Sequence, residues 1–212
     1  MLCGGKLYVF SSSIFIHYHL CYSESEHHHV ELCTWGQSNN NNWFKMRKGL
    51  ITASNFKLVC SSTDMTKTGH NVLMDPFPNN CIPHSIEFGR KYENKTRNLF
   101  MRSHWFRHRQ CKLSVPGLVL CKDDPCSFLA CSPDGIIDCR MCGRSLLEVK
   151  CSFKFSPKNS FKHVFNFFVP NDDGTLILKT SHPYYYQIQG QMAVTCISKC
   201  VLVFYTHKAF TV

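Results

Sequence analysis

The sequence contains no hydrophobic run long enough to cross a membrane. Its most apolar early stretch, residues 7–20, is interrupted by three serines and by His17 and His19. A spanning helix needs roughly 20 apolar residues, so this stretch is too short and too polar to form one. No small-x-small cleavage site follows it, which also argues against a secretory signal peptide. We therefore expect no membrane partner.

Acidic residues are scarce. The 212 residues include 14 Asp and Glu against 24 Lys and Arg, which gives a formal net charge of +10 at pH 7. A basic excess of this size is typical of proteins with a polyanionic partner, and nucleic acid is the commonest such partner. The basic residues are spread along the chain without a compact localisation signal. We expect an intracellular protein, with nuclear and cytoplasmic locations both left open.

Cysteine is abundant, but it lacks the regular pairing of a zinc knuckle. Several of the 14 cysteines lie in apolar runs, where thiols behave as small hydrophobic groups: Cys60, Cys131, Cys196 and Cys200. This pattern favours a reducing compartment. Cys139-x-x-Cys142 has the spacing of half a zinc site, and Cys121 with Cys126 or Cys131 is an irregular candidate for the other half. We therefore expect buried or incidental thiols here rather than a structural Zn²⁺.

The most informative stretch joins Ser132-Pro133-Asp134-Gly135 to Leu146-Leu147-Glu148-Val149-Lys150 through a short polar turn. The pattern predicts one β-hairpin, which residues 128–131 enter as an apolar strand and which bends at Asp134. Period-two alternation puts Glu148 and Lys150 on one face of the second strand, where burial is costly unless they pair or bind a metal. Two converging carboxylates are ligands that Mg²⁺ or Mn²⁺ prefers, and a lysine beside them can stabilise charge on a phosphate. The hairpin therefore indicates nuclease chemistry.

The remaining patterns predict an α/β fold with a mixed central sheet flanked by helices. Residues 87–109 carry an apolar stripe at helical spacing and a basic outer face, and residues 183–195 form a second helix with proline in the first position. Residues 201–205 are typical of a buried strand. We expect one nuclease domain over residues 43–212, and before it a poorly ordered N-terminal extension with an Asn-rich linker over residues 1–42.

Two local patterns allow more than one interpretation. On spacing alone, Glu93 forms an ion pair with Arg97 one helical turn away, and this surface pair is preferred over a role in a site. Arg47 with Thr52 or Ser54 fits either an ordinary capped helix with a surface arginine or a helix start that binds phosphate. The ordinary capped helix is the preferred interpretation of the second pattern.

Five motifs occur in one order along the chain. They are Trp43…Arg47-x-Gly49-x-Ile51-Thr52-Ala53-Ser54, Gly89-x-x-Tyr92-Glu93-Asn94-x-x-Arg97, Ser132-Pro133-Asp134-Gly135, Leu147-Glu148-Val149-Lys150-Cys151 and Tyr186-Gln187-Ile188-Gln189. Each alone is a weak signal. Together, over residues 43–206, they resemble the phage lambda exonuclease and YqaJ-type viral recombinase family of the PD-(D/E)XK nucleases. The resemblance implies a restriction-endonuclease-like α/β core and a metal-dependent exonuclease that digests linear duplex DNA, typically from the 5′ end, in recombination or repair.

The resemblance also implies roles for individual residues. The implied ligands of Mg²⁺ or Mn²⁺, bound as two ions, are Glu93, Asp134 and Glu148, which reverses the spacing-based interpretation of Glu93. Lys150 would position or polarise the attacking water. A glutamine of the second helix would support the lysine and the water, and Gln187 is slightly favoured over Gln189. The implied contacts to a 5′-phosphate on the DNA are Arg47, Ser54 and Ser132. A trimeric homo-oligomer is implied by the resemblance alone.

Other functions stay open at this point. An endonuclease or a single-strand nuclease would use the same core, and a non-catalytic DNA-binding module would keep the fold and the basic surface. A zinc-stabilised interaction domain is a further alternative. All the candidate catalytic positions are filled, which favours an enzyme. The helices that usually follow the last strand in this family are absent, so we expect a domain truncated at its C-terminus.

Overall fold

The structure, a computed structural model, describes residues 6–8, 17–19, 22–73, 84–108, 110–151, 166–206 and 209–211. The helices are α1 (Glu24–Cys33), α2 (Asn41–Met46), α3 (Phe56–Cys60), α4 (Met65–Leu73), α5 (His84–Arg107) and α7 (Pro183–Thr195), with 3-10 turns η1 (Gln37–Asn39), η2 (Ala53–Asn55) and η3 (Asp124–Cys126). The strands are β1 (Lys6–Tyr8), β2 (His17–His19), β3 (Ile51–Thr52), β4 (Cys111–Ser114), β5 (Val119–Leu120), β6 (Leu129–Cys131), β7 (Gly135–Cys139), β8 (Gly143–Cys151), β9 (Phe168–Pro170), β10 (Leu176–Leu178), β11 (Cys200–Thr206) and β12 (Ala209–Thr211). None of the described helices is both long and apolar enough to span a membrane.

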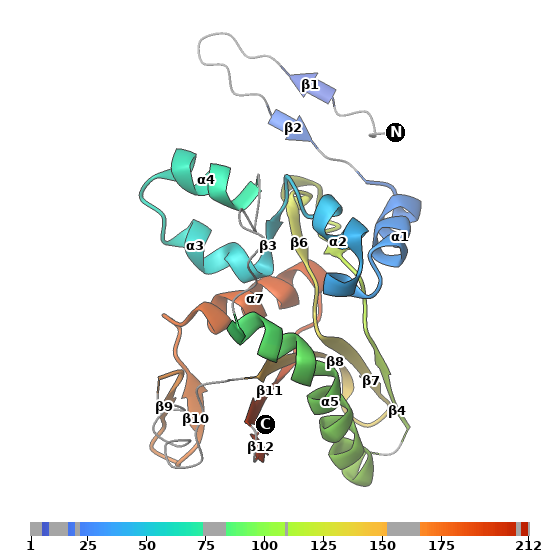
Figure 1. Cartoon of the computed structure of the whole chain (residues 1–212), viewed down its shortest axis with the longest axis vertical. Helices are drawn as coiled ribbons and strands as arrows, with labels where there is room; N and C mark the ends of the chain where they lie inside the picture. Colours follow the sequence, from blue (N-terminus) through green and yellow to red (C-terminus); the bar gives the residue numbers. More distant parts are fainter. Residues whose placement is uncertain are drawn as a thin grey trace.

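A five-stranded mixed sheet forms the centre of the fold, in the order β12-β11-β8-β7-β4 (Figure 1). β7 and β8 form an antiparallel hairpin in which Gly135 lies opposite Leu147 and Cys139 lies opposite Gly143. β11 runs parallel to β8, whereas the other neighbouring pairs in this sheet are antiparallel. The predicted α/β class, the hairpin and the strand at residues 201–205 are therefore confirmed.

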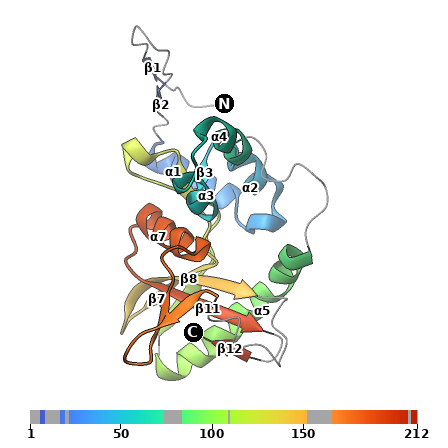
Figure 2. The ribbon, with the colours of Figure 1, turned by 90° about the vertical axis from the view of Figure 1, so that its left-hand side faces the viewer.

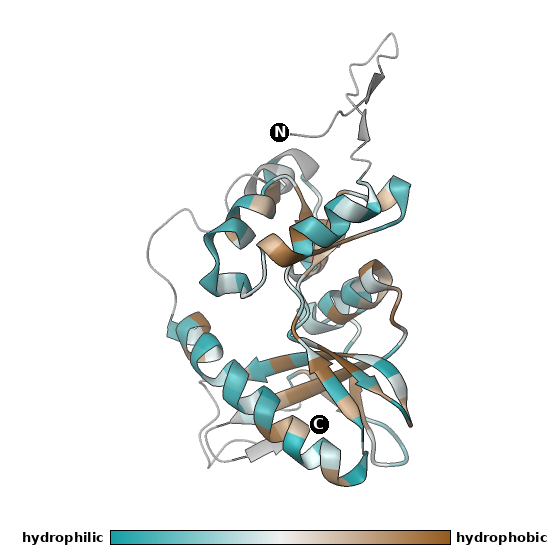
Figure 3. Cartoon of the chain, turned by 90° about the vertical axis from the view of Figure 1, so that its right-hand side faces the viewer, coloured by the Kyte–Doolittle hydropathy of each residue, from teal (hydrophilic) through white to brown (hydrophobic). Residues whose placement is uncertain are grey.

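Helices cover both faces of this sheet. Phe100 and Met101 of α5 belong to a buried cluster on one face, and Met192 of α7 packs against Ile136 and Leu146 on the other. Figure 2 shows α7 and α5 on opposite sides of β8 and β11. Figure 3 shows apolar strands crossed by α5, on which hydrophilic residues predominate, as expected of a helix with one face toward solvent. The sheet thus fixes the positions of α5 and α7 relative to the hairpin.

A smaller sheet, β3-β6-β5, lies next to α1 and α2 (Figure 1). β6 pairs antiparallel with β5 and parallel with β3. The prediction that residues 128–131 enter the hairpin is therefore wrong, because the chain leaves one sheet at Cys131 and joins the other at Gly135. Pro133 has no N–H to donate to a strand ladder, so the bend around it ends the first sheet before the second begins.

Residues 22–42 fold into helices and turns, so the expectation of a poorly ordered extension is wrong for this segment. A capping box at Ser23 and Glu26 begins α1, and the Asn42 N–H donates to the Asn40 side chain at the start of α2. Asparagine is a good N-cap residue, which explains why an Asn-rich run begins a helix instead of forming a linker. Of residues 1–21, those outside β1 and β2 lie beyond the described part of the chain.

Long-range hydrogen bonds fix this N-terminal segment to the rest of the fold. The Leu118 N–H donates to Oγ1 of Thr34 at 2.7 Å. Nε2 of Gln37 donates to the carbonyl oxygen of Pro133 at 2.9 Å. The second bond reaches the residue directly before Asp134, so the segment supports the bend that carries the predicted acid.

Candidate active site

The side chains of Glu148 and Lys150 lie on the same face of β8, as period-two alternation predicts, and both contact α7. Their neighbours Leu147 and Val149 belong to the buried cluster that α5 covers. Glu148 is only 2% exposed. A carboxylate buried this deeply is costly unless hydrogen bonds replace its water.

Three donors supply those hydrogen bonds. Oε1 of Glu148 accepts from Nζ of Lys150 at 2.5 Å and from Nε2 of Gln187 at 2.7 Å, while Oε2 accepts from Nε2 of Gln191 at 2.8 Å. Oε1 of Gln187 also accepts from Nζ of Lys150 at 3.0 Å. α7 therefore holds the side chains of Glu148 and Lys150, and Gln187 and Gln191 lie on one face of the helix because they are one helical turn apart.

Asp134 lies at the bend between β6 and β7. Its Oδ2 accepts from the Val149 N–H at 2.7 Å, and its backbone carbonyl accepts from the Arg97 guanidinium. A Cβ at Gly135 would lie 2.7 Å from a methyl carbon of Leu113, so glycine lets the chain pass closely over the neighbouring strand. These contacts place the Asp134 carboxylate beside β8 and explain the Ser-Pro-Asp-Gly pattern locally.

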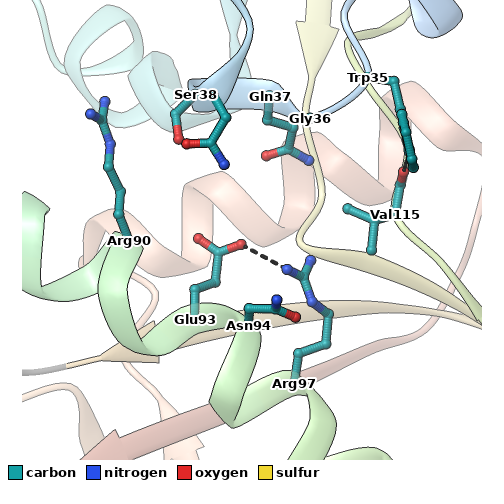
Figure 4. A pocket seen from close by; sticks show the side chains of 10 residues that line it. Trp35, Gly36, Gln37, Ser38, Arg90, Glu93, Asn94, Arg97 and Val115 are labelled. Atoms are coloured by element: carbon teal, nitrogen blue, oxygen red, sulfur yellow. Dashed lines mark hydrogen bonds and ion pairs between the residues drawn. The ribbon is translucent and has the colours of Figure 1, made fainter.

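Glu93 projects from α5 toward the same region. Its Oε1 lies 3.4 Å from Nη2 of Arg97, so the ion pair predicted from spacing is present. Figure 4 shows Glu93 with Arg97 and Arg90 from α5, facing Gln37 and Ser38 of η1 across a pocket. Glu93 also lines the neighbouring pocket that contains Asp134 and Glu148. The ion pair with Arg97 and a place in that pocket are therefore compatible.

One pocket, with a volume of about 300 Å³, collects the predicted residues. It is lined by Glu93, Asp134, Glu148, Lys150 and Gln187, and also by Arg47, Ser54 and Ser132. Gln189 is exposed on α7 and does not line this pocket, so of the two candidate glutamines the structure supports Gln187.

The carboxylates in the pocket have the character of a divalent cation site. Burial, together with the charges of Glu148 and Glu93, raises the pKa of Asp134 well above its usual value. Burial also raises the pKa of Glu93, although the positive charge of Arg97 opposes that shift. Carboxylates that lie close together repel one another, and a divalent cation relieves this repulsion by neutralising their negative charge. Carboxylate oxygens are also the ligands that Mg²⁺ and Mn²⁺ prefer. The donor chemistry of these residues therefore fits such an ion.

Lys150 remains a cation in this setting. Burial alone would lower its pKa, but the carboxylates of Glu148 and Asp134 and the hydrogen bond to Glu148 raise the pKa above its usual value. A protonated lysine donates hydrogen bonds and cannot accept a proton. Its chemistry here is to orient a polar group or to stabilise negative charge.

A cation and hydroxyl groups line another part of the pocket. Arg47 lies over the Trp43 ring at 4.1 Å and donates to Oγ1 of Thr52 at 3.0 Å, and Thr52 and Ser54 lie 3.1 Å apart between their hydroxyl oxygens. Nε1 of Trp43 donates to Oγ of Ser132 at 2.8 Å. Burial lowers the pKa of Arg47 to about 10, so it is still charged at neutral pH. This group of donors is suited to phosphate oxygens.

The same contacts correct one expectation about this segment. Neither Thr52 nor Ser54 caps a helix with its side chain. The arginine is within reach of Oγ1 of Thr52, so the hydroxyls bond to each other and to Arg47 instead. Sequence reasoning also missed Arg97 and Gln191 as site residues, and the spacing of Gln191 one turn from Gln187 was the available signal.

The chain is similar to known proteins in its sequence pattern and in its fold. The model of the YqaJ-like viral recombinase domain matches residues 42–198. Among solved structures, the alkaline exonuclease LHK-Exo from Laribacter hongkongensis is similar with a TM-score of 0.54 and 20% identity, over 80% of this chain and 76% of that chain. The shutoff and exonuclease protein SOX of Kaposi's sarcoma-associated herpesvirus is similar with a TM-score of 0.53 and 12% identity, over 87% of this chain and 61% of that chain. A search of the curated proteins finds no match.

Because the identities are only 20% and 12%, these structural likenesses show the fold alone. They confirm the predicted α/β core with a mixed sheet flanked by helices. The family match covers most of the described chain, including the hairpin, α5 and α7. The chain therefore belongs to the YqaJ-like viral recombinase domain family.

Proposed function

We propose that the chain is a divalent-metal-dependent deoxyribonuclease, acting as an exonuclease on linear double-stranded DNA in recombination or repair. The observation that carries this proposal is a single pocket that holds three carboxylates, a lysine and an arginine with hydroxyl groups. The net charge of +10 supports a polyanionic substrate. Similar solved structures also support a nucleic-acid substrate, since they include complexes of LHK-Exo with dAMP and of SOX with DNA or RNA.

Glu93, Asp134 and Glu148 are the residues that would hold Mg²⁺ or Mn²⁺, as two ions. A bound ion would neutralise charge on the scissile phosphate and lower the pKa of an attacking water. Lys150 would donate a hydrogen bond to that water or to a phosphate oxygen, since it stays protonated. Gln187 would hold the lysine in place through its carbonyl oxygen, at the distance of 3.0 Å already formed.

Arg47, Ser54 and Ser132 would bind the 5′-phosphate at a DNA end. Arg47 is positioned before substrate arrives, because Trp43 stacks on it and Thr52 accepts from it. A fixed guanidinium loses little conformational entropy on binding. A terminal phosphate held here would set the distance between the DNA end and the bond that is cut.

Replacing Asp134 by asparagine should stabilise the metal-free protein at alkaline pH. The folded-state pKa of Asp134 is raised by burial and by Glu148 and Glu93, so stability is greatest below the unfolded-state pKa and declines as pH rises through the folded-state value. The amide oxygen of Asp134→Asn can still accept from the Val149 N–H. Thermal unfolding should therefore show a higher Tm for the metal-free variant at pH 8, with the difference disappearing at acid pH.

Adding Mg²⁺ reverses the comparison. At 100 times its Kd, the ion should stabilise the unaltered protein by about 2.7 kcal/mol and leave Asp134→Asn nearly unchanged. Equal stabilisation of both proteins would show that Asp134 is not a ligand.

The function is tested by incubating the full chain with linear 5′-phosphorylated duplex, linear 5′-hydroxyl duplex and closed circular duplex. With Mg²⁺ or Mn²⁺ we expect progressive nucleotide release from the linear substrates only, and none when EDTA is present. Arg47→Gln should reduce the preference for the 5′-phosphorylated end about 10- to 100-fold, the value of a charge-assisted hydrogen bond.

The other outcomes separate the alternatives. Equal cleavage of circular and linear DNA would assign an endonuclease. No cleavage by the folded chain with either ion would remove the enzymatic proposal. Salt-sensitive DNA binding without cleavage would then assign a non-catalytic DNA-binding module.

A further inference from the structure

A second group of metal-binding side chains lies at the other end of the β7–β8 hairpin. His104 and His108 are one turn apart near the C-terminal end of α5, and Cys139 and Cys142 flank the hairpin turn. The ligand atoms of His104, His108 and Cys139 all lie within 4.8 Å of one another, and no other such cluster of three occurs among the described residues. Cys121, Cys126 and Cys131 were the candidate partners of the Cys139 pair from spacing. Cys121 and Cys131 instead lie in a different buried cluster, against which Cys126 packs.

Cys142, in the hairpin turn, lies next to two members of this group. Its Sγ lies 3.6 Å from Sγ of Cys139 and 3.0 Å from Nδ1 of His108. With Zn–S bonds of about 2.3 Å and tetrahedral angles, two ligating sulfur atoms lie about 3.8 Å apart. The sulfur atoms are therefore at nearly the separation that a shared zinc ion requires, and far outside the roughly 2.05 Å of a disulfide.

His104 provides an independent sign that a ligand belongs here. Its Nε2 is buried and has no hydrogen-bond partner within the described part of the chain. Its ring stacks on His108 at 4.4 Å between centroids and on Phe100 at 5.3 Å, which fixes the orientation of the imidazole. A buried polar atom without a partner costs about 1–3 kcal/mol, and a metal bond would remove that cost.

We propose that His104, His108, Cys139 and Cys142 bind one Zn²⁺ in a tetrahedral structural site. Two thiolates and two imidazoles are a donor set that zinc prefers, and the spacings H-x₃-H and C-x₂-C are common ones for such ligands. Magnesium and calcium favour oxygen donors and are poorly suited to this group. Because the protein fills all four positions, the site has no open position for catalysis.

Cys111 of β4 lies beside these side chains. Its Sγ donates to the backbone carbonyl oxygen of His108 at 3.3 Å, and the residue is buried. Cys111 is thus a positioning residue for the site rather than a fifth ligand.

The zinc ion would join two elements that both carry active-site acids. His104 is about 16 Å along α5 from Glu93, and Cys139 is about 17 Å along β7 from Asp134. A bond between the far ends of the helix and the hairpin restricts their relative movement at the near ends. The proposed zinc site therefore acts on the fold and is independent of the proposed catalytic ions.

The experiment is metal analysis of the full chain, purified without a histidine tag and without chelator. We expect one zinc per chain. Cys142→Ser and His108→Ala should each weaken zinc affinity by more than about 100-fold, since even residues that only support a ligand contribute about 10- to 100-fold. Cys60→Ser, which replaces an exposed cysteine outside the cluster, is the matched control and should keep the full zinc content.

Two further measurements guard against misfolded variants. Chelation should lower the Tm of the unaltered chain, and added zinc should restore it. Cobalt substitution should give the visible absorption of tetrahedral Co²⁺ with a thiolate charge-transfer band that weakens in Cys142→Ser. The proposal is overturned by a purified chain without zinc whose Tm does not respond to zinc, or by full zinc retention in Cys142→Ser.

Discussion

Glu148→Gln is expected to slow the digestion of linear duplex DNA about a thousandfold while leaving the protein folded. The substitution removes a negative charge from the proposed metal ligands at nearly unchanged shape. In the unaltered protein both carboxylate oxygens of Glu148 accept hydrogen bonds, whereas the glutamine amide has an NH₂ donor in place of one oxygen. Gln191 can rotate its amide and offer Oε1, which is buried and otherwise lacks a partner within the described residues. Single-turnover rates with Mg²⁺, together with thermal unfolding, measure both effects.

DNA binding separates the two explanations of such a loss. In the absence of metal, Glu148→Gln should bind linear duplex DNA at least as well as the unaltered chain, because one negative charge has been removed. Glu148→Ala is a harsher comparison, since it removes the carboxylate that accepts from Lys150 and from two glutamines. A Glu148→Gln variant that stays folded and cleaves at the normal rate would rule out Glu148 as a ligand.

Lys150→Met should reduce cleavage about 100- to 1000-fold, with a small effect on DNA affinity. Methionine keeps the length and the apolar stem of the lysine but cannot donate a hydrogen bond. The expected loss therefore falls on kcat rather than on KM. Because Lys150 is a hydrogen-bond donor in this proposal and not a base, the cleavage rate should not rise with pH through a lysine titration. A rate that follows deprotonation of Lys150 would contradict the assigned role.

The two glutamines of the fifth motif provide matched variants. Gln187→Ala removes contacts to both Glu148 and Lys150 and should lower kcat about 10-fold, a hydrogen-bond-sized effect. Gln189→Ala changes an exposed residue on the same helix, outside the pocket, and should have no measurable effect. Equal losses in both variants would point to a change in α7 rather than to a contact at the site.

Local patterns were sufficient wherever a residue's role depends on its own element. Alternation in β8 predicted that Glu148 and Lys150 share a face, and Pro183 correctly marked the start of α7. The long helix was expected over residues 87–109 and extends over His84–Arg107. Period and capping act over one or two turns, so a single segment contains the information they need.

Roles that depend on distant contacts were not accessible in this way. A strand was predicted over residues 128–131 and is found over Leu129–Cys131, but only its pairing with β3 and β5 decides to which sheet it belongs. The proposed partners of the Cys139 pair, His104 and His108, lie at the C-terminal end of α5 and just after it, more than thirty positions earlier in the chain. No period or spacing rule connects residues that far apart. The proposed role of Glu93 as a metal ligand comes from the family resemblance, because spacing alone predicted only the ion pair.

The hydrogen bonds of Thr34 and Gln37 bear on where a fragment for expression can begin. The family match starts at residue 42, yet the Thr34 hydroxyl accepts from the Leu118 N–H and the Gln37 amide donates to the Pro133 carbonyl. Both Leu118 and Pro133 lie within the matched region. A fragment that begins at residue 42 would lack both Thr34 and Gln37, and it would expose Leu118, which is fully buried in the intact chain. The segment matched by the family is therefore shorter than the segment that the fold needs, which includes Thr34 and Gln37.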